Sequence, residues 1–258
     1  MIRLERARKL FHRGSADERA ALDGITLELP DGAFAVVIGS NGAGKSTLLN
    51  AIAGGVQLDS GAIRIGADEV TGWPVHRRAR LVARVLQDPM LGTLPALTVE
   101  ENMALAEMRA AGRGWRPALG AGRRKRYADL LAPYGLGLES RLASRAGLLS
   151  GGQRQVLALA MAVMRTPRVL LLDEHAAALD PKTAELVMGA TLQAVGAGRP
   201  TTLMVTHNMQ HAIRYGERLL MMDAGRIRLD LAGDEKRDLT VERLVERFHL
   251  ADDKVLLS

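Results

Sequence analysis

The 258 residues contain no cysteine and few aromatic side chains, with three Phe, three Tyr and two Trp. The lack of cysteine excludes a disulfide framework and a cysteine-based zinc site. Aromatic residues are too scarce to form the stacking surfaces on which single-stranded nucleic acids are bound. We therefore expect a globular protein with no nucleic-acid partner.

Long hydrophobic runs are missing as well. The longest, Val156–Met164, ends at Arg165 and is far shorter than the ~18–20 residues that cross a bilayer. The chain begins with charges at Arg3, Glu5 and Arg6, a pattern that does not resemble a secretion signal. We expect a cytosolic protein, so that any membrane pathway must come from other chains.

The chain carries a formal net charge of +6. Much of the excess lies in two clusters, Arg77, Arg78, Arg80 and Arg84, and Arg113, Arg116, Arg123, Arg124, Lys125 and Arg126. Basic clusters favour an anionic membrane surface at roughly 1 kcal/mol per residue, but they also occur on ordinary solvated helices. Both interpretations stay open at this point.

A glycine-rich loop is the first motif that carries chemistry. The apolar run Phe34–Ile38 predicts a buried strand, and a helix is predicted over Lys45–Ala53. Between them the chain fits the G-x-x-x-x-G-K-[ST] pattern with Gly39, Ser40, Asn41, Gly42, Ala43, Gly44, Lys45, Ser46 and Thr47. This pattern predicts that backbone N–H groups and the Lys45 charge hold the β- and γ-phosphates of a nucleotide, and that the Ser46 hydroxyl binds Mg²⁺.

Two acidic residues end a second apolar run. Val169–Leu172 predicts a central parallel strand, and Asp173 and Glu174 follow it. We expect Asp173 to hold Mg²⁺ through water and Glu174 to polarise the attacking water, a general-base role worth ~10²–10⁴ in rate. The alternative is a solvated acidic strand end.

A second glycine-rich turn follows Leu149 and consists of Ser150, Gly151, Gly152 and Gln153. It precedes a buried helix predicted over Gln153–Met164, whose N-terminus is a second anion site. One protein that binds one ATP needs only one such cradle. An ordinary helix cap would explain the turn alone, but not its position 105 residues after Lys45 and 23 before Asp173.

With these motifs in this order, the chain resembles the ATP-binding subunit of an ABC transporter from about Ile2 to about Phe248. The resemblance implies that the second turn, the family signature, meets the γ-phosphate held by the Walker A loop, residues 39–47, of a partner copy. ATP is then bound in a head-to-tail homodimer, and Asp173 and Glu174 end the Walker B strand.

The resemblance also assigns four single residues. Gln87, the Q-loop glutamine, touches Mg²⁺ and the attacking water and links to the membrane subunit. Asp180, in the D-loop, crosses the dimer, and it is also an ordinary N-cap before a proline. His207 contacts the γ-phosphate, and Phe11 stacks on adenine. The implied catalytic residues are Glu174, His207 and Gln87, and the implied metal ligands are Ser46, Gln87 and Asp173.

One departure separates this chain from most of the family. His175 and Ala176 stand where a proline and a threonine usually follow the Walker B acids. His175 resembles the branch of tryptophan/tyrosine-type small-solute uptake ATPases. Three other stretches resemble the same branch, residues 39–41, 87–93 and 205–209. His175 is either a second polar group near the γ-phosphate or, as we favour, a packing replacement in the loop.

The implied fold is α/β, a P-loop NTPase of the ABC ATPase type. It has a RecA-like core sheet, an N-terminal antiparallel β subdomain and an inserted α-helical subdomain. Residues 1–258 form one ABC ATPase domain, with 1–87 and 168–258 as the nucleotide-binding core and 88–167 as the helical signature subdomain. Helical patterns over Glu100–Ala110 and Arg123–Tyr134 agree with the insertion.

The implied function is ATP hydrolysis that powers uptake of an amino acid or similar small solute through a separate membrane permease. The expected partners are a second copy, the permease and an extracytoplasmic solute-binding protein, at the cytoplasmic face of the inner (plasma) membrane. The alternative is an exporter or a lipoprotein- or peptide-release system, which the polar insertion Arg13–Ala20 somewhat resembles. A soluble ABC ATPase of DNA repair or translation would carry coiled coils, zinc modules or two cassettes.

Overall fold

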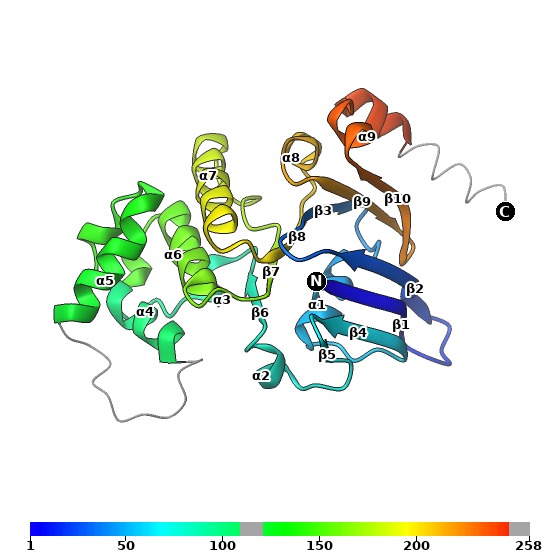
Figure 1. Ribbon diagram of the computed structural model, residues 1–258, viewed down its shortest axis with the longest axis horizontal. Helices are drawn as coiled ribbons and strands as arrows, with labels where there is room; N and C mark the ends of the chain where they lie inside the picture. Colours follow the sequence, from blue (N-terminus) through cyan, green and yellow to red (C-terminus); the bar gives the residue numbers. More distant parts are fainter. Residues whose placement is uncertain (109–120, 248–258) are drawn as a thin grey trace. The chain divides into compact units, whose positions relative to one another are not determined.

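The computed structural model describes residues 1–108 and 121–247 (Figure 1). Contacts divide the chain into two compact units. The first unit combines Met1–Leu81 with the chain from Thr201 onward, and the second unit is Val82–Pro200. These boundaries differ from the predicted 87/88 and 167/168, because the strand before residue 87 pairs with the strand that begins at Val169. The division into a nucleotide-binding core and a helical signature subdomain remains a prediction.

An antiparallel sheet opens the first unit, in the order β2-β1-β4-β5. It consists of β1 (Ile2–Phe11), β2 (Arg19–Leu29), β4 (Ser60–Ile65) and the short β5 (Asp68–Glu69). The N-terminal antiparallel β subdomain is thereby confirmed. Arg19 at the start of β2 pairs with Phe11 at the end of β1, so the two strands form a hairpin around the polar insertion.

The parallel part of the first unit centres on β3 (Phe34–Gly39), which pairs with β8 (Thr201–Val205) and β9 (Arg218–Asp223). A hairpin joins β9 to the antiparallel β10 (Arg226–Ala232). The helices are α1 (Lys45–Ala53), α2 (Val75–Arg78), α8 (Met209–Arg214) and α9 (Asp234–Arg237). Residues 241–247 are also helical, and the Thr240 hydroxyl caps them by accepting from the Arg243 amide at 3.3 Å.

The second unit contains the parallel pair β6 (Val82–Val85) and β7 (Val169–Asp173). Its helices are α3 (Pro89–Gly92), α4 (Val99–Met108), α5 (Ala121–Leu131), α6 (Gly151–Val163) and α7 (Pro181–Gly198), with 3₁₀ turns at Ala132–Tyr134, Leu138–Ser140 and Ala146–Leu148. Helix α6 packs against α7 and β6, so the apolar Val156–Leu159 segment is buried. None of the helices within residues 1–108 and 121–247 is long and apolar enough to cross a membrane.

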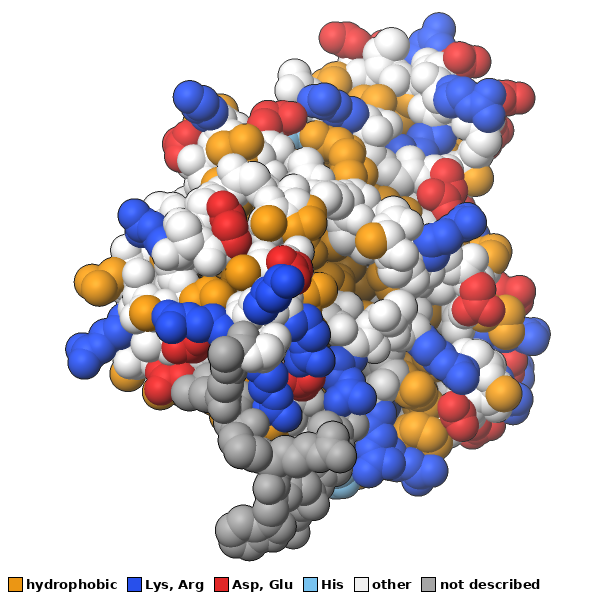
Figure 2. All heavy atoms as spheres, turned by 60° about the vertical axis from the view of Figure 1, so that its left-hand side comes forward, with side chains coloured by type: hydrophobic (Ala, Val, Ile, Leu, Met, Phe, Trp, Pro, Cys, Tyr) orange, Lys and Arg blue, Asp and Glu red, His pale blue; other side chains and the backbone are white. Residues whose placement is uncertain are grey.

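Several side chains of the two basic clusters pair with other side chains of the same unit. Arg124 pairs with Glu100 at 3.2 Å, and Arg126 pairs with Glu107, so α5 and α4 neutralise each other. In the other cluster the Arg77 guanidinium lies 3.6 Å from the centre of the Trp73 ring. Figure 2 shows acidic side chains beside many of the basic ones, while in its lower middle basic side chains gather with few acidic neighbours. This pairing favours the solvated-helix interpretation, while Arg113 and Arg116 lie outside the described residues.

Arg78 is the largest fully buried side chain of the described residues, at 1% exposure. Its guanidinium donates to the carbonyls of Thr71 at 2.7 Å, Trp73 at 3.2 Å and Ile52 at 3.1 Å, and also to that of Ala51. Ala51 and Ile52 belong to the last turn of α1, whose final carbonyls have no partner within the helix. A buried cation therefore caps the helix that follows the glycine-rich loop and complements its dipole.

Arg78→Ala should lower the free energy of unfolding by on the order of 2–4 kcal/mol, because four buried or partly buried carbonyls lose the guanidinium as a donor and a cavity opens. Urea unfolding followed by circular dichroism measures this loss. The exposed Arg80→Ala is the matched control and should change stability by less than about 0.5 kcal/mol. Equal effects of the two substitutions would contradict the capping role.

Candidate functional site

The loop between β3 and α1 is shaped by glycines that no other residue could replace. Gly39 has φ +152° and Gly44 has φ +103°. A Cβ at Gly39 would lie 2.2 Å from the Met222 carbonyl oxygen, and one at Gly44 would lie 2.2 Å from the Ala21 carbonyl oxygen. The backbone therefore passes so close to β9 and β2 that only a residue without a side chain fits.

Lys45, the first residue of α1, is buried with 7% exposure. Its Nζ donates to the carbonyl oxygens of Gly39 at 2.7 Å and Ser40 at 2.9 Å, so the ammonium group lies inside the loop. The first N–H groups of this nine-residue helix have no partner within the helix. Together they form a positive, donor-rich cradle that fits a polyphosphate, and the exposed Ser46 offers the hydroxyl oxygen that Mg²⁺ prefers.

His207 leaves the first unit at the same edge as this loop. β3 and β8 run parallel, and the Thr206 amide donates to the Val37 carbonyl at 3.1 Å. Because parallel strands present their carboxyl ends at one edge, the loop after β3 and the exposed His207 after β8 emerge together. Phe11, the other predicted site residue of this unit, ends β1 with 37% exposure, and the Lys9 ammonium lies 5.6 Å from its ring centre.

In the second unit β7 ends at Asp173, and Glu174 follows in a left-handed conformation with φ +48°. Such a backbone costs a non-glycine residue of order 1–3 kcal/mol and persists only where the surroundings impose it. The Ala177 amide donates to the Glu174 carbonyl at 3.0 Å and closes the turn. The second acid is thus turned sharply away from the strand direction.

Arg84 of β6 binds the first of these acids. Its Nη2 donates to Asp173 Oδ2 at 2.6 Å, and both side chains are largely buried. Arg84 was predicted only as a member of a basic cluster, and its contact with Asp173 was not predicted. The signal that could have found it is an arginine on the neighbouring parallel strand, two positions behind the acid in register.

His175 is fully enclosed, at 2% exposure. Its Nε2 lies 2.8 Å from the Thr191 hydroxyl, which itself donates to the Val187 carbonyl at 2.9 Å. Because the hydroxyl proton is committed to Val187, the imidazole Nε2–H is the donor to Thr191. His175 therefore anchors the turn after β7 to helix α7, the packing role that the sequence favoured.

The second glycine-rich turn begins helix α6 with a capping box. Ser150 Oγ accepts from the Gln153 amide at 3.2 Å, and Gln153 Oε1 accepts from the Ser150 amide at 3.1 Å. A Cβ at Gly152 would lie 2.3 Å from Thr183 Cγ2, so this glycine lets α6 approach α7. The helix-cap alternative thus describes the local geometry, and Ser150 and Gly151 remain exposed.

Gln87 and Asp180 are the remaining predicted site residues of the second unit. Gln87 is exposed just after β6, and the buried Gln155 of α6 donates to the preceding Leu86 carbonyl at 2.9 Å. Asp180 caps α7 by accepting from the Thr183 amide at 3.1 Å, and hydrogen bonding to Thr183 lowers the pKa of its carboxyl. Since β6 and β7 are parallel, Gln87, Asp173 and Glu174 share one edge.

Comparisons with known proteins identify the family. Residues 22–177 match the family described as ABC transporter. The chain belongs to the ABC transporter ATP-binding family.

Its relatives include a tyrosine transport ATP-binding protein of Clostridioides difficile (strain R20291), 41% identical over 97% of this chain and 100% of the relative. A lipoprotein-releasing system ATP-binding protein of Nitrobacter hamburgensis is 37% identical over 89% of this chain and 96% of the relative. A solved ATP-binding cassette, dimeric and in a post-hydrolysis state with ADP and phosphate, matches with TM-score 0.76 and 27% identity over 90% of this chain and 98% of that one.

Family and fold settle the general activity. This ABC ATPase binds and hydrolyses ATP as the ATP-binding protein of a transporter. The resemblance to ABC transporter ATP-binding subunits and the predicted fold class are thereby confirmed. The individual site residues remain predictions, now with the geometry described above.

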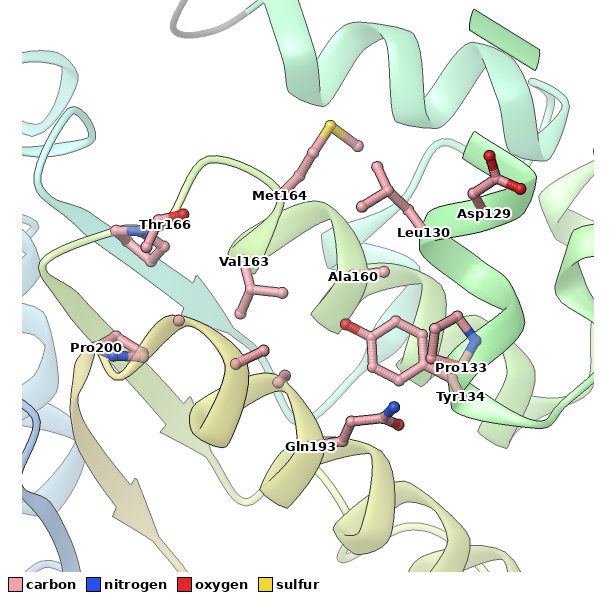
Figure 3. Close-up of a pocket in the computed structure, with 14 residues that line it drawn as sticks. Asp129, Leu130, Pro133, Tyr134, Ala160, Val163, Met164, Thr166, Gln193 and Pro200 are labelled. Carbon is pink, nitrogen blue, oxygen red and sulfur yellow. The ribbon is translucent and has the colours of Figure 1, made fainter. Parts of the chain in front are cut away.

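The ABC ATPase also has a cavity of about 320 Å³ in its second unit (Figure 3). It lies among α5, the 3₁₀ turn after it, α6 and α7, with the Tyr134 ring and the Gln193 amide among its walls. Burial raises the pKa of the Tyr134 phenol. None of the predicted site residues lines this cavity.

The capping geometry permits a sharp test of the signature turn. Ser150→Asp should keep the cap, since Asp and Ser serve equally well there, but it places a negative charge where a partner's γ-phosphate is expected. ATP turnover should fall by at least about tenfold at unchanged thermal stability. Ser150→Asn, a neutral cap, is the matched control and should retain most turnover. If Ser150→Asp hydrolyses ATP at the parent rate, Ser150 is a helix cap and nothing more.

Proposed function

We propose that this ABC ATPase drives uptake of an amino acid or similar small solute through a separate membrane permease. The observation that carries the transport role is the pair of phosphate cradles, one at Lys45 and one at Ser150, where a single bound nucleotide needs one. The named function of the 41% identical relative, tyrosine transport, supports an amino acid as cargo. The expected partners are the permease and an extracytoplasmic solute-binding protein.

The proposed chemistry divides the residues by role. The Walker A backbone and Lys45 hold the phosphates, Phe11 stacks on adenine, and Ser46, Asp173 and Gln87 hold Mg²⁺. When bound, the metal neutralises charge on the phosphates. Glu174 and His207 orient and polarise the attacking water. Carboxylate, amide and hydroxyl oxygens are the donors that Mg²⁺ prefers, so these side chains fit the metal.

Two copies then bind two ATP molecules at a shared interface. In each site, residues 39–47 of one copy and residues 150–153 of the other enclose the nucleotide, and Asp180 crosses the interface. Closure follows from the higher affinity of ATP for the closed dimer, and hydrolysis reverses it. We place this dimer peripherally at the cytoplasmic face of the inner (plasma) membrane, where its motion acts on the permease.

Glu174→Gln should keep ATP binding and reduce turnover by ~10² or more, because the substitution removes only the water-polarising base. ATP-bound dimer should accumulate and is measured by light scattering. Lys45→Ala is the comparison variant and should lose ATP binding and the dimer together. A Glu174→Gln protein that hydrolyses ATP at the parent rate would move the base elsewhere, with His207 the next candidate.

The segment after Gln87 is the proposed contact with the permease. Met90 and Leu91 of α3 are 43% and 73% exposed, and Leu94 is 51% exposed. Arg154 of α6 contacts Met90 and also donates to the Leu149 carbonyl at 2.9 Å, directly before the signature turn. Force on α3 therefore has a short path of contacts to the start of α6.

Replacing Met90 and Leu91 together with Asp should leave ATP binding and folding unchanged and uncouple transport, because an apolar contact with the permease becomes charged. The measurements are co-purification with the permease and solute uptake in vesicles. Leu186→Asp with Leu192→Asp is the matched control, since these α7 side chains are 48% and 43% exposed. Unchanged uptake in the Met90/Leu91 variant would place the docking surface elsewhere.

A release system is the second candidate, supported by the 37% identity to a lipoprotein-releasing ATP-binding protein. The segment 13–18 forms a compact turn in which Glu18 accepts from the Gly14 amide at 2.7 Å. The same vesicle experiment separates the two functions: solute-dependent ATPase with inward accumulation supports uptake. Substrate release from the membrane in its place would establish the alternative.

A further inference from the structure

The parallel strands β6 and β7 bring an arginine to the carboxylate that is assigned to Mg²⁺. Arg84 pairs in register with Leu171, and Asp173 lies two residues further along β7, on the same face of the strand as Leu171. Side chains on strands lean along the strand direction, so Arg84 reaches diagonally forward to the end of β7. This geometry, rather than a flexible surface encounter, produces the 2.6 Å contact between Nη2 and Oδ2.

The contact is a strong one for its position. Arginine stays protonated at all relevant pH, and charge-assisted hydrogen bonds to a carboxylate are about twice as strong as neutral ones. The side chains of Arg84 and Asp173 are only 23% and 16% exposed, so solvent and salt screen the pair less than a surface pair. Arg84 thus neutralises the Asp173 carboxylate, whose negative charge a divalent cation needs.

We propose that Arg84 is an intramolecular competitor of Mg²⁺ for Asp173 and thereby sets the metal concentration at which the site is loaded. The inference rests on the proposed metal role of Asp173. When only a fraction of the protein has the carboxylate released, the apparent Kd for metal rises by the inverse of that fraction. The relation is reciprocal: metal binding releases Arg84, and metal departure gives Asp173 its partner again.

The test measures Mn²⁺ binding by electron paramagnetic resonance in the presence of ATP, in full-length protein that carries Glu174→Gln to stop turnover. Arg84→Gln in this background should bind Mn²⁺ about tenfold more tightly, as expected if one molecule in ten has a released carboxylate. Arg84→Lys keeps the charge and should stay within about threefold of the parent. Arg84→Met, of similar length, replaces Arg84→Gln if the latter does not fold.

The matched control is Arg168→Gln. Arg168 is exposed and immediately precedes β7, at the opposite end of the strand from Asp173, so its loss removes the same charge from the same unit. It should leave the Mn²⁺ affinity unchanged. If Arg84→Gln and Arg84→Met bind Mn²⁺ as the parent does, or more weakly, the competition is overturned.

Asp173→Asn separates this inference from the proposed site. If Asp173→Asn binds Mn²⁺ as tightly as the parent, Asp173 is not the metal carboxylate, and both the site assignment and the inference fail. If Asp173→Asn loses metal while Arg84→Gln does not gain it, only the competition fails. In the variant that combines Asp173→Asn with Arg84→Gln, the loss of Arg84 should no longer tighten Mn²⁺ binding, because the carboxylate for which Arg84 and the metal compete is gone.

Discussion

Parallel strand pairing is the constraint on which the site of each unit depends. In the first unit, pairing of β3 with β8 brings the glycine-rich loop and His207 to one edge, and in the second, pairing of β6 with β7 does so for Gln87 and the acids after β7. Strands β3, β7 and β8 are buried on both faces, so a shift of either register by one residue would exchange their side chains between two packed faces and disrupt the packing of each. The hydrophobic burial of the strands therefore fixes the positions of polar groups that contribute nothing to that burial.

The N-termini of helices supply the other groups of the proposed site. The same cap and backbone N–H groups serve both helix stability and phosphate binding. Ser150 and Asp180 are good N-caps for α6 and α7, and Lys45 opens α1 from inside its own loop. A cap satisfies one or two of the N–H groups at a helix start and leaves the others for a ligand. The same turn can thus be needed for folding and still meet a phosphate.

Most strands and long helices were predictable because apolar periodicity and glycine-rich turns mark them directly. The glycine-rich loop, the acids after β7 and the signature turn follow from short motifs. The roles of Arg78 and Arg84 were not predictable in this way, because each depends on a partner distant in sequence: Arg78 on the end of α1, and Arg84 on a strand that begins 85 residues later at Val169. Strand β6 was also missed, since four residues with an arginine among them give no clear alternation.

Contacts on both sides of the turn after β7 offset its unusual sequence. A proline at position 175 would fix φ by its ring, and histidine has no such restraint. In this chain the His175–Thr191 hydrogen bond ties the residue after Glu174 to α7, while Arg84 holds the residue before it. Glu174, with φ +48°, sits between these two anchors. The left-handed backbone of the proposed base is therefore flanked on both sides by residues that side-chain contacts tie to β6 and α7.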